Sequence, residues 1–159
     1  MTPKTQSMPP AATHPTIYSS MRAQSDFHLH TNQIANRLLS TGGVSLDEAL
    51  SMNQTLDDWS QTLPPYFQLD QEPPSQEAWY LFARSRLWWR LWNLKITLFR
   101  QILLRRAMSK TGHVPPFPVN AVDDKCRDAC VDAAHSTVLS IHDFLEHNEL
   151  TRLVGWYAM

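Results

Sequence analysis

Two neighbouring stretches of the sequence decide the fold, Leu56-Asp-Asp-Trp-Ser-Gln-Thr-Leu-Pro-Pro-Tyr-Phe67 and Trp88-Trp-Arg-Leu-Trp-Asn-Leu-Lys-Ile-Thr-Leu-Phe-Arg100. The first is typical of a helix end, because proline lacks an amide donor and restricts the residue before it, so Pro64 and Pro65 stop the helix. The second combines aliphatic, aromatic and basic residues without proline or glycine, which indicates an uninterrupted helix. The sequence therefore predicts one helix, a proline corner and a second, longer helix.

The longer helix is expected at about residues 75–110. Ser75 follows two prolines and can cap its start, and the next glycine is Gly112. Two adjacent apolar stripes make an arc wider than the buried face of a surface helix, so we expect this helix to be central and packed on more than one side. One stripe is Tyr80, Ala83, Leu87, Leu91, Leu94, Leu98 and Ile102, and the other is Phe82, Trp89, Trp92, Ile96, Phe99 and Leu103.

Other segments also show helical patterns. Apolar residues recur at three-to-four spacing from Asp26 to Leu38, which predicts a short first helix, and Ser45 and Glu48 have capping-box spacing at the start of the next one. A further helix is expected from near Asn120, and the apolar residues 150–159 indicate a fifth helix that the chain end interrupts. No segment alternates with period two, so the predicted fold class is all-α, an incomplete multi-helix bundle.

The composition divides the chain into two parts. Residues 1–24 are rich in Pro, Ser and Thr and are expected to be a disordered linker. Residues 25–159 are expected to form one domain, truncated at its C-terminal end. With 159 residues and 43% hydrophobic content, the chain is long enough for a single core.

The charge pattern gives no reason to expect direct nucleic-acid binding. The formal net charge is -1. The basic residues of the long helix scatter around its axis, whereas a phosphate-binding stripe needs them on one face, so we expect them to reach water or neighbouring carboxylates. No stretch of about 18 uncharged apolar residues occurs, and no membrane partner is expected.

The residues that carry metal or catalytic chemistry are sparse. Cys126 and Cys130 share one helix face, but His135 lies nearly half a turn away, so we expect reduced, buried thiols and no metal or cofactor in this chain. The sequence lacks Gly-x-Ser-x-Gly, His-Glu-x-x-His and a phosphate-binding glycine loop. We therefore expect a protein that is not an enzyme.

Three groups of residues follow one another in a characteristic order. The first is Asp57, Trp59, Leu63 and Pro64, the second is Arg90, Asn93, Leu94, Ile96, Leu98 and Arg100, and the third is Cys130, Ala133 and Ala134. Together they resemble the middle homology region of fungal zinc-cluster transcription factors, a regulatory region, over residues 25–159. One departure is Arg100-Gln-Ile-Leu103, where many relatives have Arg-Pro-x-Leu.

The resemblance implies a helical regulatory region that controls RNA polymerase II transcription in the nucleus. It implies protein partners or a small-molecule effector, and it allows a homodimer in the full-length form. Two cysteines cannot build the six-cysteine zinc cluster of the family. Zinc and DNA binding are therefore expected only in the missing cluster of a full-length relative.

The tryptophans of the long helix are the candidates for a binding surface. Their helical spacing suits a core, yet four tryptophans on one helix are hard to bury together. We expect one or two of Trp88, Trp89 and Trp92 to line a groove for a partner or an effector. The alternative function is a freestanding helical adaptor or small-metabolite-binding module that uses this helix as its groove.

Overall fold

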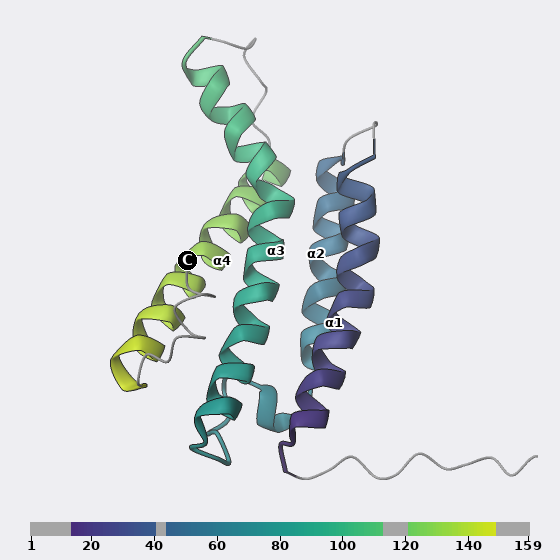
Figure 1. The fold of residues 1–159 in the computed structure, drawn as a ribbon. Coiled ribbons are helices and arrows are strands. Elements are labelled where there is room, and N and C mark those ends of the chain that lie inside the picture. The colour runs from purple at the N-terminus through teal and green to yellow at the C-terminus, as the bar shows by residue number, and fades with distance from the viewer. Residues whose placement is uncertain (1–13, 41–43, 113–120, 149–159) are drawn as a thin grey trace, which may run out of the picture.

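The computed structural model describes residues 14–40, 44–112 and 121–148, and these residues form an all-α bundle without strands. The linker residues 1–13 and the expected fifth helix at 150–159 lie outside the described residues. Four α-helices and one short 3-10 helix are present (Figure 1). Their bounds are α1 Ile17–Leu38, α2 Leu46–Gln61, η1 Pro65–Phe67, α3 Ala78–Lys110 and α4 Ala121–His147.

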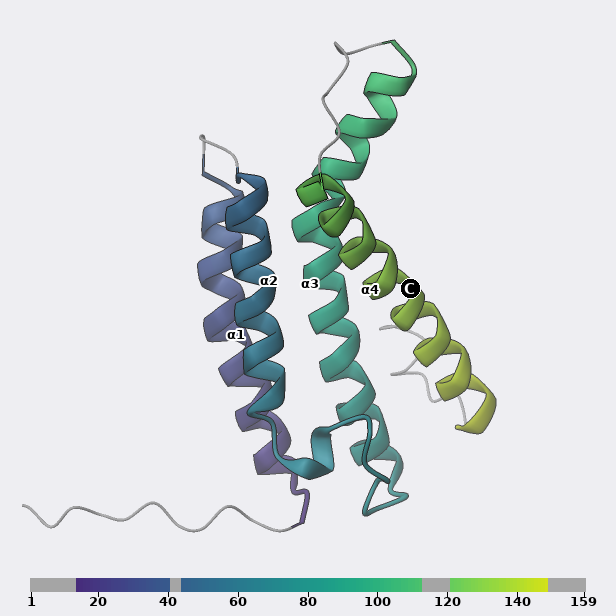
Figure 2. The ribbon, with the colours of Figure 1, turned by 180° about the vertical axis from the view of Figure 1, so that it is seen from behind.

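The predicted central position of the long helix is confirmed. Successive helices run antiparallel, with α1 and α2 on one side of α3 and α4 on the other (Figures 1 and 2). Helix α3 has 33 residues and contacts each of the other three α-helices, most extensively α4. Its C-terminal turns extend beyond the neighbouring helices (Figure 1), and there Leu104 and Met108 are exposed.

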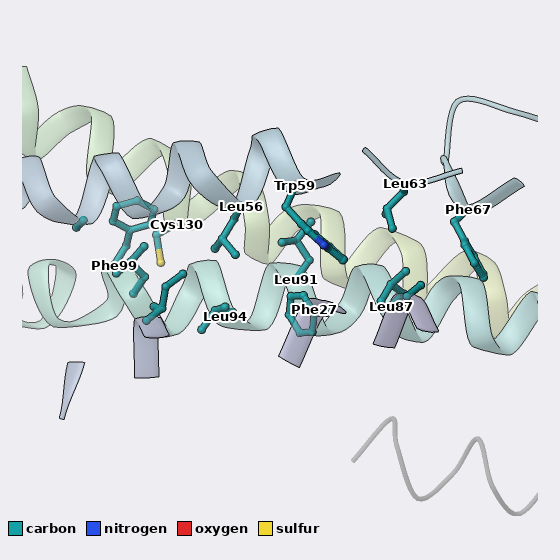
Figure 3. Close-up of a cluster of buried hydrophobic side chains, with 14 of the residues drawn as sticks. Phe27, Leu56, Trp59, Leu63, Phe67, Leu87, Leu91, Leu94, Phe99 and Cys130 are labelled. Carbon is teal, nitrogen blue, oxygen red and sulfur yellow. The ribbon is translucent and has the colours of Figure 1, made fainter. Parts of the chain in front are cut away.

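The main core lies between α3 and the α1–α2 pair. Figure 3 shows α2 side chains directed at the leucines of α3, with the α1 ring of Phe27 on the opposite side of the cluster. Each large apolar side chain buried in this way contributes roughly 1.5–3 kcal/mol. The labelled members of this core are Phe27, Leu56, Trp59, Leu63, Phe67, Leu87, Leu91, Leu94, Phe99 and Cys130.

A second apolar cluster joins α3 to the C-terminal half of α4. Trp89 and Phe144 are both buried, and their rings meet edge to face with centroids 5.4 Å apart. Phe144, and not its neighbour Leu145, takes the inward position on α4, and Leu145 is 37% exposed. The larger aromatic ring fills the space beside Trp89, and the leucine lies one helical step away.

The first helix begins earlier than predicted. It starts at Ile17 and not near Asp26, so residues 17–24 are helical and the expected linker boundary at residue 24 is too late. Thr16 and Ser19 form a capping box, in which each side chain accepts a hydrogen bond from the backbone N–H of the other. The buried Ala23 then anchors this part of α1 to the core.

The predicted starts of the two following helices are close to the observed ones. Ser45 caps α2 and accepts from the backbone N–H of Glu48 at 3.2 Å. The Glu48 carboxylate, however, binds Arg37 of α1 with both oxygens and does not complete the expected capping box. Helix α3 begins at Ala78, and Ser75, its expected cap, accepts from the N–H of Glu77 in the preceding turn.

We expect Arg37→Gln to lower the melting temperature at about pH 7 and to have a progressively smaller effect as the pH is lowered below 4.5. The Arg37 hydrogen bond holds the pKa of Glu48 below its ordinary value of 4.5. A carboxyl with a lowered folded-state pKa stabilises the fold above its unfolded value, and this contribution disappears as the pH falls through the folded-state pKa. Thermal unfolding followed by circular dichroism measures the effect.

Arg22→Gln is the matched control, because Arg22 is an exposed arginine on the same helix. Its melting temperature should follow that of the unmodified protein over the same pH range. An equal loss for Arg37→Gln in neutral and acidic solution would contradict the assignment of the pair.

Candidate functional site

The connection between α2 and α3 contains a corner (residues 64–71, the proline corner) whose backbone carbonyls need hydrogen-bond donors. Pro64 and Pro65 have no backbone N–H groups. The 3-10 turn that follows satisfies only some of the backbone carbonyls of this corner. Gln68 folds back and donates from Nε2 to the carbonyls of Ser60, at 2.8 Å, and Leu63, at 3.1 Å. These bonds satisfy carbonyls at the C-terminal end of α2.

Three side chains of α3 bind the other side of the proline corner. Tyr80, Arg84 and Trp88 are spaced four residues apart, so they lie on one face of the helix. Tyr80 donates its hydroxyl to the carbonyl of Tyr66, and the Trp88 indole Nε1 donates to the carbonyl of Phe67 at 2.7 Å. Three successive turns of α3 therefore hold the corner in place.

The middle member of this face binds two carbonyls. Arg84 donates from Nη2 to the carbonyls of Gln68 and Gln71, the latter at 2.6 Å. A charged donor makes a stronger bond to a carbonyl than a neutral one does. Together, Tyr80, Arg84 and Trp88 form what we call the donor ladder of α3.

The next position on the same face is Trp92, one turn beyond the proline corner. Its ring centroid lies 5.9 Å from that of Trp88, but its indole has no hydrogen bond among the described residues. Trp89, by contrast, faces α4 and donates to the hydroxyl of Ser140 at 3.0 Å. Of the three tryptophans expected to line a groove, Trp88 and Trp89 are thus bound through their indole N–H groups, whereas Trp92 only packs against the second apolar cluster.

Trp92 lines a cavity of about 290 Å³ between α2, α3 and α4, which we call the junction cavity. Its wall is mostly polar and contains an ion pair between Asp57 of α2 and Lys95 of α3. Asn53 donates from Nδ2 to the second carboxylate oxygen of Asp57 at 2.9 Å. The lining residues are Asn53, Asp57, Trp92, Lys95, Ala129, Asp132, Ala133 and Ser136.

The first group of motif residues lies at the end of α2. Asp57 enters the junction cavity, while the buried Trp59 packs on Phe27 of α1 with ring centroids 5.1 Å apart. Leu63 is buried, and Pro64 precedes the 3-10 turn. This group positions α2 and opens the proline corner.

The second and third groups meet where α4 crosses α3. Leu94 and Leu98 are buried in α3, and the carbonyl of Ile96 lies 3.9 Å from the Cys130 sulfur of α4, within the range of a weak thiol hydrogen bond. Ala133 is buried on the wall of the junction cavity. The small side chains of the third group let α4 approach α3 closely.

Four residues of the second and third groups lie outside this junction. Asn93 and Arg100 are exposed, and Ala134 is half-buried. Arg90 reaches α1 and donates to the side-chain oxygen of Gln24 at 2.6 Å. The motif thus combines residues that build the junction with residues that do not touch it.

Sequence reasoning missed most of the polar residues of the junction cavity. Asn53 and Asp57, and likewise Asp132 and Ser136, are polar pairs four residues apart at the edge of a buried face. Polar pairs with this spacing were the only sequence signal for the cavity residues. They did not identify the cavity, because polar residues on an exposed helix face have the same spacing. Lys95 is one of the scattered basic residues of the long helix, which are expected to reach water or carboxylates of neighbouring helices. The ion pairs Lys95–Asp57 and Arg106–Asp124 confirm this expectation for two of these residues.

The thiols of α4 belong to the core. Cys126 and Cys130 are free and buried, and burial raises the pKa of both thiols, so they stay protonated at neutral pH. A zinc ligand must be the thiolate. Within the described ranges, no group of three or more His, Cys, Asp or Glu residues is arranged to hold a metal ion.

Comparisons with known proteins return no family model, no curated protein and no solved structure that matches this chain. Among the described helices, none is long and apolar enough to cross a membrane.

We expect Trp88→Phe to lower the free energy of unfolding by about 1–3 kcal/mol, because the change removes the donor to a partly buried carbonyl. Trp92→Phe is the matched control on the same helix face and removes no indole hydrogen bond within the described structure. Urea denaturation followed by tryptophan fluorescence or circular dichroism gives both values. Equal losses in the two variants would contradict the donor ladder.

Proposed function

We propose that this chain is a regulatory module similar to the middle homology region of fungal zinc-cluster transcription factors. In this proposal it acts in the nucleus on RNA polymerase II transcription, through contacts with proteins or an effector and without catalysis. DNA binding belongs to a zinc cluster that this chain does not contain. A homodimer is the proposed assembly of the full-length form.

The observation that supports the proposal is the convergence of the three motif groups. Asp57, Ile96 and Cys130 are distant in sequence, yet they lie where α2, α3 and α4 meet. Residues of the first and third groups, Asp57 and Ala133, line the same cavity. Each of the three groups alone is a weak signal of the family. A shared structural role explains why the three groups occur together in one chain.

The junction cavity favours a second candidate, a freestanding small-metabolite-binding module. The cavity combines an aromatic side chain with polar groups that can orient a ligand, and its volume of about 290 Å³ is close to that of the smallest ligand pockets. This candidate requires ligand binding but no effect on transcription. A transcription assay therefore separates the two.

The test places the full chain between a heterologous DNA-binding domain and an activation domain and measures reporter expression in yeast. We expect expression to differ from that of a fusion in which a flexible linker of equal length replaces the chain. Leu94→Asp should abolish the difference, since it puts an unpaired carboxylate into the core. Asn93→Asp, at the exposed neighbouring position, should retain it.

Equal expression from the folded chain and from the flexible linker would overturn the proposal. Circular dichroism of the purified fusion, compared with that of the Leu94→Asp fusion, establishes that the chain is folded in this comparison.

A further inference from the structure

The junction cavity carries more negative than positive charge. Its walls contain two carboxylates, Asp57 and Asp132, and one ammonium group, Lys95. The Lys95 side chain is only 14% exposed and its Nζ is bound to Asp57 Oδ1. The positive charge is therefore already neutralised, whereas Asp132 is exposed and forms no ion pair with any described residue.

The cavity wall also contains a hydrogen-bond acceptor without a donor. Asn53 donates its Nδ2 to Asp57 Oδ2, which fixes the amide so that Oδ1 is the remaining acceptor. That Oδ1 is buried and has no hydrogen-bond partner within the described structure. An unsatisfied buried acceptor costs roughly 1–3 kcal/mol, and a ligand N–H reaches this one only by displacing the amide from Asp57.

The apolar wall of the cavity is suited to a cation as well. The Trp92 indole lines it, and the ring of Trp88 packs against this indole at a tilt, with centroids 5.9 Å apart. The face of an indole attracts ammonium groups more strongly than other aromatic side chains do. The net charge and the aromatic wall thus favour the same ligand chemistry.

We propose that the junction cavity binds a small organic amine in its protonated form. The ammonium group lies between Asp132 and the Trp92 ring, and a short aliphatic body occupies the remaining space. A volume of about 290 Å³ is at the lower end of ligand cavities, so the ligand has few heavy atoms. The role of this ligand as an effector rests on the proposed function. Its binding to the junction cavity does not.

A carboxylate ligand does not fit this site. It would face Asp132 and Asp57 at close range, and repulsion between like charges in a partly desolvated cavity is unfavourable. An uncharged ligand gains neither the Asp132 charge nor the cation–π contact.

The test is isothermal titration calorimetry of the full chain at low ionic strength with three five-carbon ligands. Diaminopentane, pentanediol and glutarate have similar length and differ in charge. We expect saturable binding of diaminopentane and no binding of the other two. Asp132→Asn should weaken diaminopentane binding by about tenfold, the effect of losing one charge-assisted hydrogen bond.

Asp143→Asn is the matched control, since Asp143 lies on the same helix, outside the cavity, beside His147. It should bind diaminopentane as the unmodified chain does. A second variant, Ala129→Leu, fills the cavity without changing its charge and should abolish binding. Melting temperatures of the three variants establish that they are folded.

Several results would overturn the proposal. These are no binding of diaminopentane, equal binding of the diol or glutarate, an equal loss in Asp132→Asn and Asp143→Asn, and unchanged binding in a folded Ala129→Leu. If diaminopentane binds as expected but does not change reporter expression in the transcription assay, the effector role is wrong while the binding site stands.

Discussion

The structure depends on the hydrogen bonds that α3 donates to the proline corner. A chain that turns at Pro64 and Pro65 exposes carbonyls without supplying enough N–H groups, and buried carbonyls must be bound. Tyr80, Arg84 and Trp88 supply the donors from three successive turns of one helix. They thereby fix where α2 ends relative to α3, and the helices cannot slide along each other without breaking these bonds.

The junction cavity follows from that arrangement. The end of α2 is held against the first half of α3, so Asp57 of α2 lies opposite Lys95 of α3. Trp92 continues the face of the donor ladder but lies one turn beyond the proline corner, so that it lines the cavity. Helix α4 closes the third side through the small residues Ala129 and Ala133. A structural constraint at the corner thus leaves an aromatic and polar site next to it.

The all-α class, the central helix and the proline corner were predictable, because helical periodicity and proline chemistry act locally. The start of α1 was not, since Ser19 takes the capping-box position where a pattern search looks for Glu or Gln. Nor was the donor ladder, whose spacing also suits a buried apolar stripe. The cavity forms where the polar edges of different helices meet in the folded protein. The sequence around Asn53 and Asp132 does not show that their helices bring them to the same place.

Trp88 and Trp89 donate their indole N–H groups to the proline corner and to α4, whereas the Trp92 indole N–H has no partner within the described structure. Hydrogen exchange of the indole N–H groups, followed by nitrogen-15 NMR, tests this claim most directly. We expect the Nε1 protons of Trp88 and Trp89 to exchange slowly, because they are bonded to Phe67 and Ser140, and that of Trp92 to exchange rapidly. Exchange of the Trp88 indole as fast as that of Trp92 would contradict the claim.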